Sequence, residues 1–466
     1  MPLDTSSMTI SSALTSLRAG EFSAVSLSEV CLRRIEQLNP ELNAFITPTP
    51  ELAVQAALSA NAIIALRPSN LNDLSLLGIP VALKDLFDLV GVQTTAGSKF
   101  LAGTIASEDA EVVKKIKLAG ASIVGKTNTH EFALGVTGVN PHYGPVKNPW
   151  DQARIPGGSS SGSAVAVATG MCLAALGTDT GGSIRIPASL CGLVGLKPTM
   201  GRVSTRGVFP LSWNLDHVGT LSRCVRDAAI LLSTLAGFDP HDPTSVDTPV
   251  DNYCNHLEEG VKNWKVAIAV GSFFQDADPQ ILDAMVEASR VFKNLGAQVE
   301  KVDLSWIGDL ALANGLMTQA DGATVHRDRL ASNPEWFGAD VRQRLEVGAA
   351  LSSSDYVQAR RTQSEGRRHF ETFFTKYDLL ILPTTPIPAP LIEGTGAIEA
   401  ARRLTRFTAP FNLTGLPVLS IPCGFMDGMP FGLQLVTKHW DEGRLLQAGY
   451  AYEQVTPWHT AHPHIS

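Results

Sequence analysis

The chain of 466 residues has no long hydrophobic run, no cysteine pair motif and no basic stretch. Its longest weakly polar run, residues 164–177, contains Thr169 and glycines and is too short to span a bilayer. The six cysteines are scattered and form no C-x-x-C pair, which argues against a disulfide framework or a zinc site. The first ten residues lack a cationic segment followed by an apolar one, so they do not resemble a secretory signal. We therefore expect a soluble, cytoplasmic protein.

Positive charge is also in short supply. Lys and Arg number 37 against 45 Asp and Glu, and the net charge of −8 argues against a general binder of nucleic acids or anionic membranes.

There is no H-E-x-x-H motif, and His459, His462 and His464 lie in a polar, proline-interrupted tail, where we expect solvated side chains. The sequence therefore predicts no metal, no cofactor, no membrane contact and no direct nucleic-acid partner.

The chain does contain enough apolar residues for a large core. Of its residues 44% are hydrophobic and 18% charged, as is typical of globular proteins. Apolar residues recur at helical spacing over residues 11–37, with a break at Gly20, and helices and short apolar strands alternate further along. The expected strands are 79–83, 121–124, 266–270, 298–304, 379–382, 418–422 and 432–436; the expected later helices are 51–66, 107–120, 280–295 and 356–374. This alternation predicts a layered α/β architecture.

Two clusters rich in glycine and serine, residues 154–163 and 176–185, are the most informative part of the sequence. Glycines let the backbone approach a ligand closely, and serines supply hydroxyl groups. Because tight turns also expose backbone N–H groups, the clusters contain the parts of a nucleophile and an oxyanion hole. A flexible linker is the alternative, but the apolar run of residues 164–168 between the clusters does not fit one.

Two shorter patterns compete with this interpretation. Residues 120–127 match the phosphate-loop pattern G-x-x-x-x-G-K-[ST], but that motif needs a strand before its first glycine, and the preceding segment is helical in pattern. Residues 158–162 match the nucleophile-elbow pattern G-x-S-x-G, which needs a buried strand upstream, whereas residues 151–156 are polar and broken by proline. We favour neither pattern.

Lys84 extends the clusters into a longer series of motifs. It ends the segment G-I-P-V-A-L-K. Further along the chain come Gly157-Gly158-Ser159-Ser160 and residues 177–183, and Ser159 and Ser183 are 24 residues apart. With further matches at residues 411–417 and 432–435, the series resembles the amidase signature family of serine amide hydrolases. The resemblance implies a single large α/β domain over residues 71–466, with a mixed twisted β-sheet flanked by helices, continuous with a helical region at residues 1–70.

The resemblance also implies a catalytic triad. Ser183 is the expected nucleophile, Lys84 the expected base, and Ser159, after a cis peptide bond from Gly158, relays a proton between them. The expected oxyanion hole consists of the backbone N–H groups of Thr180, Gly181, Gly182 and Ser183. The expected supporting residues are Ser160, Asp179 and Arg185, of which the last two equally fit a structural ion pair. The expected acyl pocket is lined by Ala133, Leu134 and Gly135, for which ordinary core packing is the alternative.

Lys84 acts as a base only when its amine is uncharged. The apolar residues 81–83 before it would remove it from water, and burial disfavours the ammonium form and lowers the pKa of a lysine. The alternative is a lysine at a strand end in an ion pair with Asp85 or Asp88. The local sequence does not separate these two interpretations.

The resemblance implies an amidase that hydrolyses a small carboxamide, or a carbamate or urea-like amide, to a carboxylate and ammonia or an amine through an acyl-enzyme. The alternatives are the glutaminase component of a tRNA-dependent amidotransferase, which releases ammonia from glutamine, and a catalytically silent member of a complex. Ile186 stands where that glutaminase commonly has glutamine, and Thr129 and His130 also depart from its usual sequence, which favours a free-standing amidase. We expect a small-molecule amide as the partner, and a homodimer as the assembly that the family favours.

Overall fold

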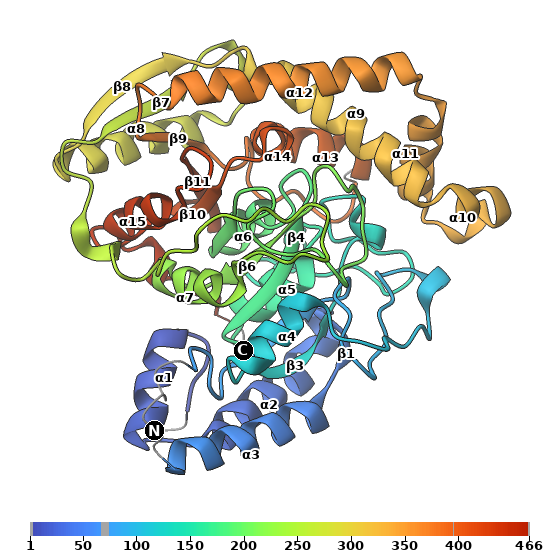
Figure 1. Cartoon of the computed structure of the whole chain (residues 1–466), viewed down its shortest axis with the longest axis vertical. Coiled ribbons are helices and arrows are strands. Elements are labelled where there is room, and N and C mark those ends of the chain that lie inside the picture. The colour runs from blue at the N-terminus through green and yellow to red at the C-terminus, as the bar shows by residue number, and fades with distance from the viewer. Residues whose placement is uncertain (1–2, 67–73, 395, 465–466) are drawn as a thin grey trace.

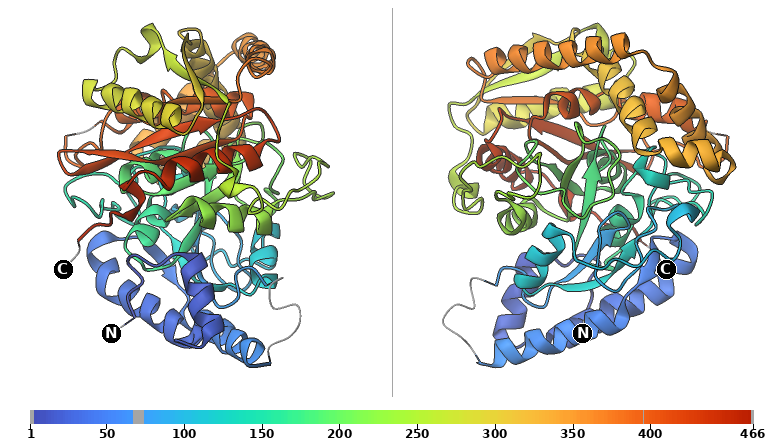
Figure 2. Two further views of the ribbon diagram at one scale, coloured as in Figure 1. Left: turned by 90° about the vertical axis from the view of Figure 1, so that its left-hand side faces the viewer. Right: turned by 45° about the vertical axis from the view of Figure 1, so that its right-hand side comes forward.

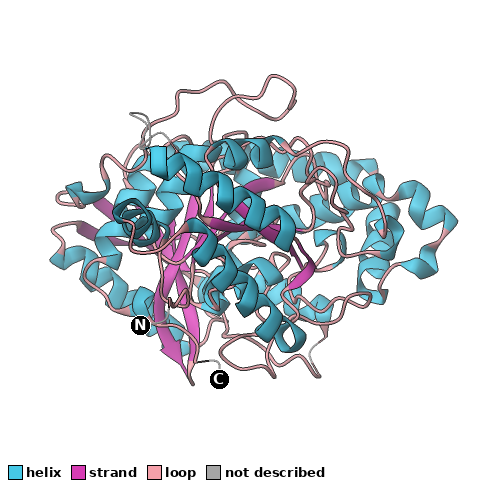
Figure 3. Ribbon diagram, turned by 90° about the horizontal axis from the view of Figure 1, so that it is seen from below, coloured by secondary structure: helices cyan, strands magenta, loops and turns pink. Residues whose placement is uncertain are grey.

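The computed structural model describes residues 3–66, 74–394 and 396–464. A mixed sheet of eleven strands crosses this part of the chain in the order β1-β3-β2-β4-β6-β5-β10-β11-β9-β7-β8 (Figure 1). Helices flank the sheet, as the view from below shows (Figure 3). The predicted fold class is confirmed. Across these ranges, no helix combines the length and the apolar character that crossing a membrane requires.

The elements alternate along the whole chain. The strands are β1 (Phe45–Pro48), β2 (Pro80–Lys84), β3 (Ser122–Thr127), β4 (Ala174–Asp179), β5 (Val194–Lys197), β6 (His217–Ser222), β7 (Lys265–Val270), β8 (Gln298–Asp303), β9 (Leu379–Pro383), β10 (Val418–Met426) and β11 (Met429–Val436). The helices are α1 (Ile10–Ala19), α2 (Ala24–Leu42), α3 (Pro50–Leu66), α4 (Glu111–Leu118), α5 (Ser161–Ala168), α6 (Arg185–Cys191), α7 (Val225–Leu235), α8 (Pro279–Asn294), α9 (Ile307–Val325), α10 (Arg327–Ser332), α11 (Ala339–Ala350), α12 (Ser353–Phe373), α13 (Ala397–Leu404), α14 (Ala409–Thr414) and α15 (Glu442–Glu453).

The N-terminal helices α1, α2 and α3 lie together at one end of the molecule (Figure 2). Between α2 and α3 the chain forms β1, which pairs antiparallel with β3 through Phe45 and Thr127. The N-terminal region therefore adds an edge strand to the sheet. The expected boundary between residues 70 and 71 lies outside the described residues.

Strand β2 lies between β3 and β4 and is parallel to both. The register pairs Leu83 with Leu176, so the last residues of β2 and β4 reach the same edge of the sheet. Helices α5 and α6 consist of small and apolar residues with one arginine, and every residue of both is buried. They are core helices that begin beside the ends of these strands.

The C-terminal part of the chain returns to the end of the sheet at which strands β2 and β4 finish. The hairpin of β10 and β11 joins β5 to β9, and α6 packs against both hairpin strands. Helices α9, α11 and α12 lie together over this half, and α14 packs on α9 (Figure 1). Residues near positions 408–434 are thereby brought next to residues 177–185.

The predicted strands are all present, with their ends displaced by a few residues. The helix predicted over residues 107–120 is shorter, since α4 begins at Glu111. Strands β4, β5 and β6 and helices α5 and α6 were not predicted as elements. Their glycine, serine and alanine residues carry little of the hydrophobic periodicity from which helices and strands are read.

Candidate active site

Lys84 ends β2 with its side chain fully buried, at 0% exposure. Its Nζ donates to Ser159 Oγ at 2.7 Å and to Thr178 Oγ1 at 2.7 Å. Burial lowers the pKa of the Lys84 amine to about 7, while the charges of Asp216 and Asp179 act in the opposite direction. Burial therefore favours the neutral amine, the form that a base requires.

The ion-pair alternative for Lys84 does not hold for Asp85. That carboxylate pairs with Lys126 at 2.8 Å, and both side chains are fully buried. Lys126 also donates to Gln93 O and to Thr94 Oγ1, each at 3.1 Å. Since residues 122–127 form strand β3, the phosphate-loop interpretation of this segment is wrong.

The segment before α5 brings the serines together. The peptide bond between Gly158 and Ser159 is cis. Ser159 O accepts from Thr129 Oγ1 at 2.8 Å, and the Ser160 N–H donates to Ser183 O at 3.2 Å. Ser160 Oγ donates to Thr178 O at 3.2 Å, which ties the segment to β4 as well.

The turn after β4 requires a glycine at position 182. Gly182 has a φ of 136°, and a Cβ there would overlap Thr408 Oγ1. Its N–H donates to Asp179 Oδ1 at 2.7 Å, and the Ile184 N–H donates to Asp179 Oδ2 at 3.1 Å. In this structure the Gly182 N–H is therefore bound within the turn, to the carboxylate of Asp179.

Asp179 and Arg185 form a buried ion pair that fastens the turn to distant parts of the chain. The Arg185 guanidinium donates to both carboxylate oxygens, at 2.9 and 3.0 Å. It also donates to Gln434 Oε1 at 2.8 Å and to Asn412 Oδ1 at 2.5 Å. Burial alone would raise the pKa of the Asp179 carboxyl, but the adjacent Arg185 holds it well below its usual range.

Ser183 lies in the wall of a cavity of about 1050 Å³. The predicted pocket residues Ala133, Leu134 and Gly135 lie in the same wall, which is also lined by residues of α9. Arg344 lines the cavity too, and its guanidinium donates to Leu134 O at 3.3 Å and Ala397 O at 3.1 Å. Its Nε has no hydrogen-bond partner among the described residues.

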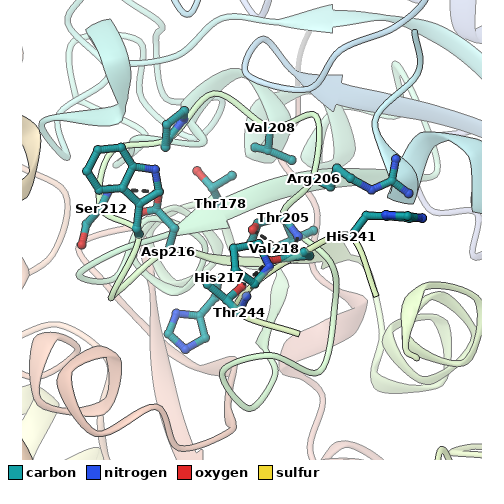
Figure 4. A pocket seen from close by; sticks show the side chains of 14 residues that line it. Thr178, Thr205, Arg206, Val208, Ser212, Asp216, His217, Val218, His241 and Thr244 are labelled. Carbon is teal, nitrogen blue, oxygen red and sulfur yellow. Dashed lines mark hydrogen bonds between the residues drawn. The ribbon is translucent and has the colours of Figure 1, made fainter. Parts of the chain in front are cut away.

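A second, smaller cavity of about 330 Å³ adjoins the site (Figure 4). Thr178 and Asp216 lie in its wall. We predicted no functional role from the sequence for Thr178, Asp216 or Arg344. Thr178 lay within a quoted motif, whereas nothing in the sequence places residues 216 and 344 near Lys84 or Ser183.

An α/β sheet that brings a buried lysine, two serines and a glycine turn together at one edge is typical of serine hydrolases that act on amides. The family model described as Amidase matches residues 26–446. The chain belongs to this family, whose members hydrolyse amide C–N bonds.

The relatives include components of larger enzymes. The chain is 40% identical over 474 residues to the A subunit of glutamyl-tRNA(Gln) amidotransferase from Nitrosococcus oceani, covering 96% of this chain and 97% of that protein. The structure of the Thermotoga maritima protein of the same name has a TM-score of 0.83 at 33% identity, over 98% and 96% of the two chains. The chain is also similar to a chain from the structure of a vestigial protein complex that reveals the evolutionary origins of an s-triazine catabolic enzyme. The TM-score is 0.90 at 33% identity, over 96% of this chain and 98% of that chain.

These comparisons overturn the expected partners. We expected a small-molecule amide, no direct nucleic-acid partner and a homodimer as the favoured assembly. The relative from Nitrosococcus oceani is one component of an enzyme named for glutamyl-tRNA(Gln), and one structural neighbour is a protein complex. The expectation was wrong because the net charge of this chain reports only on partners bound at its own surface, and the dimers favoured by the family say nothing about a different protein subunit.

Proposed function

We propose that the protein is a serine amidase in which Ser183, Ser159 and Lys84 form the catalytic triad. The observation that carries this proposal is the hydrogen bond of 2.7 Å between the buried Lys84 amine and Ser159 Oγ. Thr178 Oγ1 accepts one N–H of the amine, which leaves the lone pair of the neutral form for the proton of Ser159.

The reaction begins when Ser183 Oγ bonds to the carbonyl carbon of the amide. Ser183 passes its proton to Ser159 Oγ, and Ser159 passes its own proton to Lys84 Nζ. The tetrahedral intermediate then breaks its C–N bond, and the leaving nitrogen takes a proton from Ser159, which regains one from Lys84. Water hydrolyses the acyl-Ser183 ester along the same proton path and releases a carboxylate.

The oxyanion is stabilised in this proposal by the backbone N–H groups of Thr180, Gly181 and Ser183. Gly182 supplies the turn rather than a donor, because its N–H is bound to Asp179. Loss of one such donor typically costs on the order of 3 kcal/mol in the transition state. The supporting residues fix the positions of the turn and of the segment that contains Ser159; they are Ser160, Asp179 and Arg185.

The wall of the larger cavity indicates the class of amide. Arg344 contributes a guanidinium to that wall, and a carboxylate is the ligand that a guanidinium group prefers. Ala133, Leu134 and Gly135 leave room for a short acyl chain in the same wall. We propose a small carboxamide that also carries a carboxylate, as glutamine does.

The names of the relatives support a role as the glutaminase component of an amidotransferase. In this proposal the chain releases ammonia from glutamine, and a partner protein uses the ammonia. A second candidate is an amidase for another carboxylate-bearing amide, which is favoured by Ile186, Thr129 and His130, the positions that depart from the glutaminase pattern.

Ammonia release by the purified protein, with and without the proteins that accompany it in its native host, tests both candidates. Glutamine should be hydrolysed faster than short neutral amides if the chain is a glutaminase component, whereas another acidic amide should be preferred if the second candidate is right. A fluorophosphonate should label the wild type on Ser183 and leave Ser183→Ala unlabelled. Undiminished turnover by Ser183→Ala would rule out the triad.

A further inference from the structure

Asp216 lies at the start of β6, directly opposite the end of β4. The register pairs Asp179 with His217, so Asp216 faces the first residue of the turn that contains Ser183. Its Oδ1 accepts from Thr180 Oγ1 at 2.5 Å, and its Oδ2 accepts from the N–H groups of Leu211 at 2.8 Å and Ser212 at 3.0 Å. Both oxygens are occupied, so the position of the carboxylate is defined.

The same carboxylate stands close to the surroundings of Lys84. Asp216 and Thr178 lie in the wall of the smaller cavity (Figure 4). Thr178 Oγ1 also accepts from Lys84 Nζ. Lys84 itself donates to hydroxyl groups rather than to a carboxylate. Asp216 therefore acts on the amine through its charge, with no shared hydrogen bond.

We propose that Asp216 is a positioning residue of the amidase site, which anchors Thr180 and places a fixed negative charge beside Lys84. This inference rests on the proposed triad. During acylation Lys84 becomes an ammonium ion inside the protein, and a nearby anion lowers the free energy of that state. The pKa values agree in direction: burial lowers that of Lys84 and the charge of Asp216 opposes this effect, more than any other group does.

Several other titratable groups lie near Asp216 and Lys84, including the buried Lys197, whose charge acts on Asp179 and His217. Asp179 is bound to Arg185, and burial holds the pKa of His217 well below its usual range. The remaining titratable groups around the smaller cavity are Arg206, His241 and Asp242 in its wall, and Asp321, which accepts from Ser212 Oγ. Among the carboxylates, that of Asp216 has the largest effect on the pKa of Lys84, which its charge raises.

The test compares Asp216→Asn with Asp242→Asn. Asp242 lies in the wall of the same cavity but bonds to Thr205 and Thr244, so its replacement removes a charge without touching the turn. The readout is the pH dependence of the rate at which a fluorophosphonate labels Ser183, because this rate needs the neutral form of Lys84. In the wild type the rate should rise with pH through a midpoint near 7.

Removing the negative charge makes Lys84 less basic, so in Asp216→Asn the midpoint should move to lower pH, by about one pH unit. The labelling rate at high pH should fall at the same time. Asp242→Asn should keep the wild-type midpoint, and Asp216→Glu, which retains the charge, should restore it at least in part. If Asp216→Asn does not fold, Asp216→Ser gives the same comparison with a smaller side chain.

A folded Asp216→Asn or Asp216→Ser protein with the wild-type midpoint would overturn the inference, and so would an equal shift in Asp242→Asn. Absence of labelling in the wild-type protein would instead contradict the proposed triad. The two failures are therefore distinguishable in one series of measurements.

Discussion

At the scale of single residues, two buried lysines stand on neighbouring strands with different surroundings. Lys126 lies on β3 and faces the carboxylate of Asp85 at 2.8 Å. Lys84 lies on β2 and donates to the hydroxyl groups of Ser159 and Thr178. A carboxylate keeps a buried amine charged, whereas hydroxyl groups let it become neutral. Only the second environment suits a base.

Replacement of each lysine by methionine should separate these roles. Lys84→Met should lower kcat by a factor on the order of 10³ or more, because it removes the general base, with little loss of folding stability. Lys126→Met should instead lower the free energy of unfolding by about 3–5 kcal/mol, since Asp85 is left as a buried charge without its partner. Steady-state kinetics and denaturant unfolding measure the two effects.

A Lys84→Met protein that keeps most of its activity would contradict the assignment of the base. Equal losses of stability in both variants would show that Lys84 is also a charged structural residue. The motif around Lys84 was readable from the sequence. Its contact with Thr178 and its proximity to Asp216 were not, because they depend on the pairing of β2, β4 and β6.

At the scale of elements, the turn between β4 and α6 carries Ser183, the proposed nucleophile. Its conformation depends on Gly182, whose φ of 136° is rarely adopted by other residues. Asp179 accepts from the N–H groups of residues 182 and 184 and thereby closes the turn from inside. Arg185 then attaches it to α14 through Asn412 and to β11 through Gln434.

Gly182→Ala should displace this turn, because the new Cβ would overlap Thr408 Oγ1. Catalytic efficiency should fall on the order of 10²-fold or more, as for the loss of an oxyanion donor. Gly181→Ala is the matched variant, since the nearest atom to its Cβ would be Asn314 Oδ1, at 3.2 Å. It should lose far less, and kcat/KM with thermal unfolding of both proteins provides the check. Similar losses in the two variants would contradict this role of the turn.

Elements with a clear hydrophobic period were predicted well, as α8 and the strands β7 and β9 show. Strand β2, which carries Lys84, was predicted as well, but the elements beside Ser159 and Ser183 were not, because their residues are small. Helix α5 is composed of Ser, Gly, Ala and Val, and all of its residues are buried. A segment that is buried all round has no polar face, so it lacks the periodic pattern from which a helix is read.

At the scale of the whole molecule, the larger cavity is assembled from distant parts of the chain. Its wall includes residues 133–136, the turn at 180–183, part of α9, Arg344 of α11, and residues 398–409. The catalytic edge of the sheet supplies one side, and the helices beyond residue 307 supply the other. In the proposed function, substrate preference therefore depends mainly on the later part of the chain.

Arg344→Ala should raise KM for an amide that carries a carboxylate by about 10- to 100-fold, because it removes a charge-assisted hydrogen bond of roughly 1.5–3 kcal/mol. KM for a neutral amide of the same length should stay unchanged. Arg403→Ala removes another arginine from the cavity wall at an exposed position and should change neither value much. An equal rise for the charged and the neutral amide would contradict a carboxylate site at Arg344.

The sequence by itself determined the α/β class, the family and the residue types at positions 84, 159 and 183, because motifs of adjacent residues survive in linear order. The tertiary structure alone decided which groups surround them. Lys84 is desolvated by strands on both sides, Gly182 gives its N–H to Asp179, and Asp216 reaches the site from β6. Burial and the fields of charges depend on distances in space, and residues far apart in the chain set those distances.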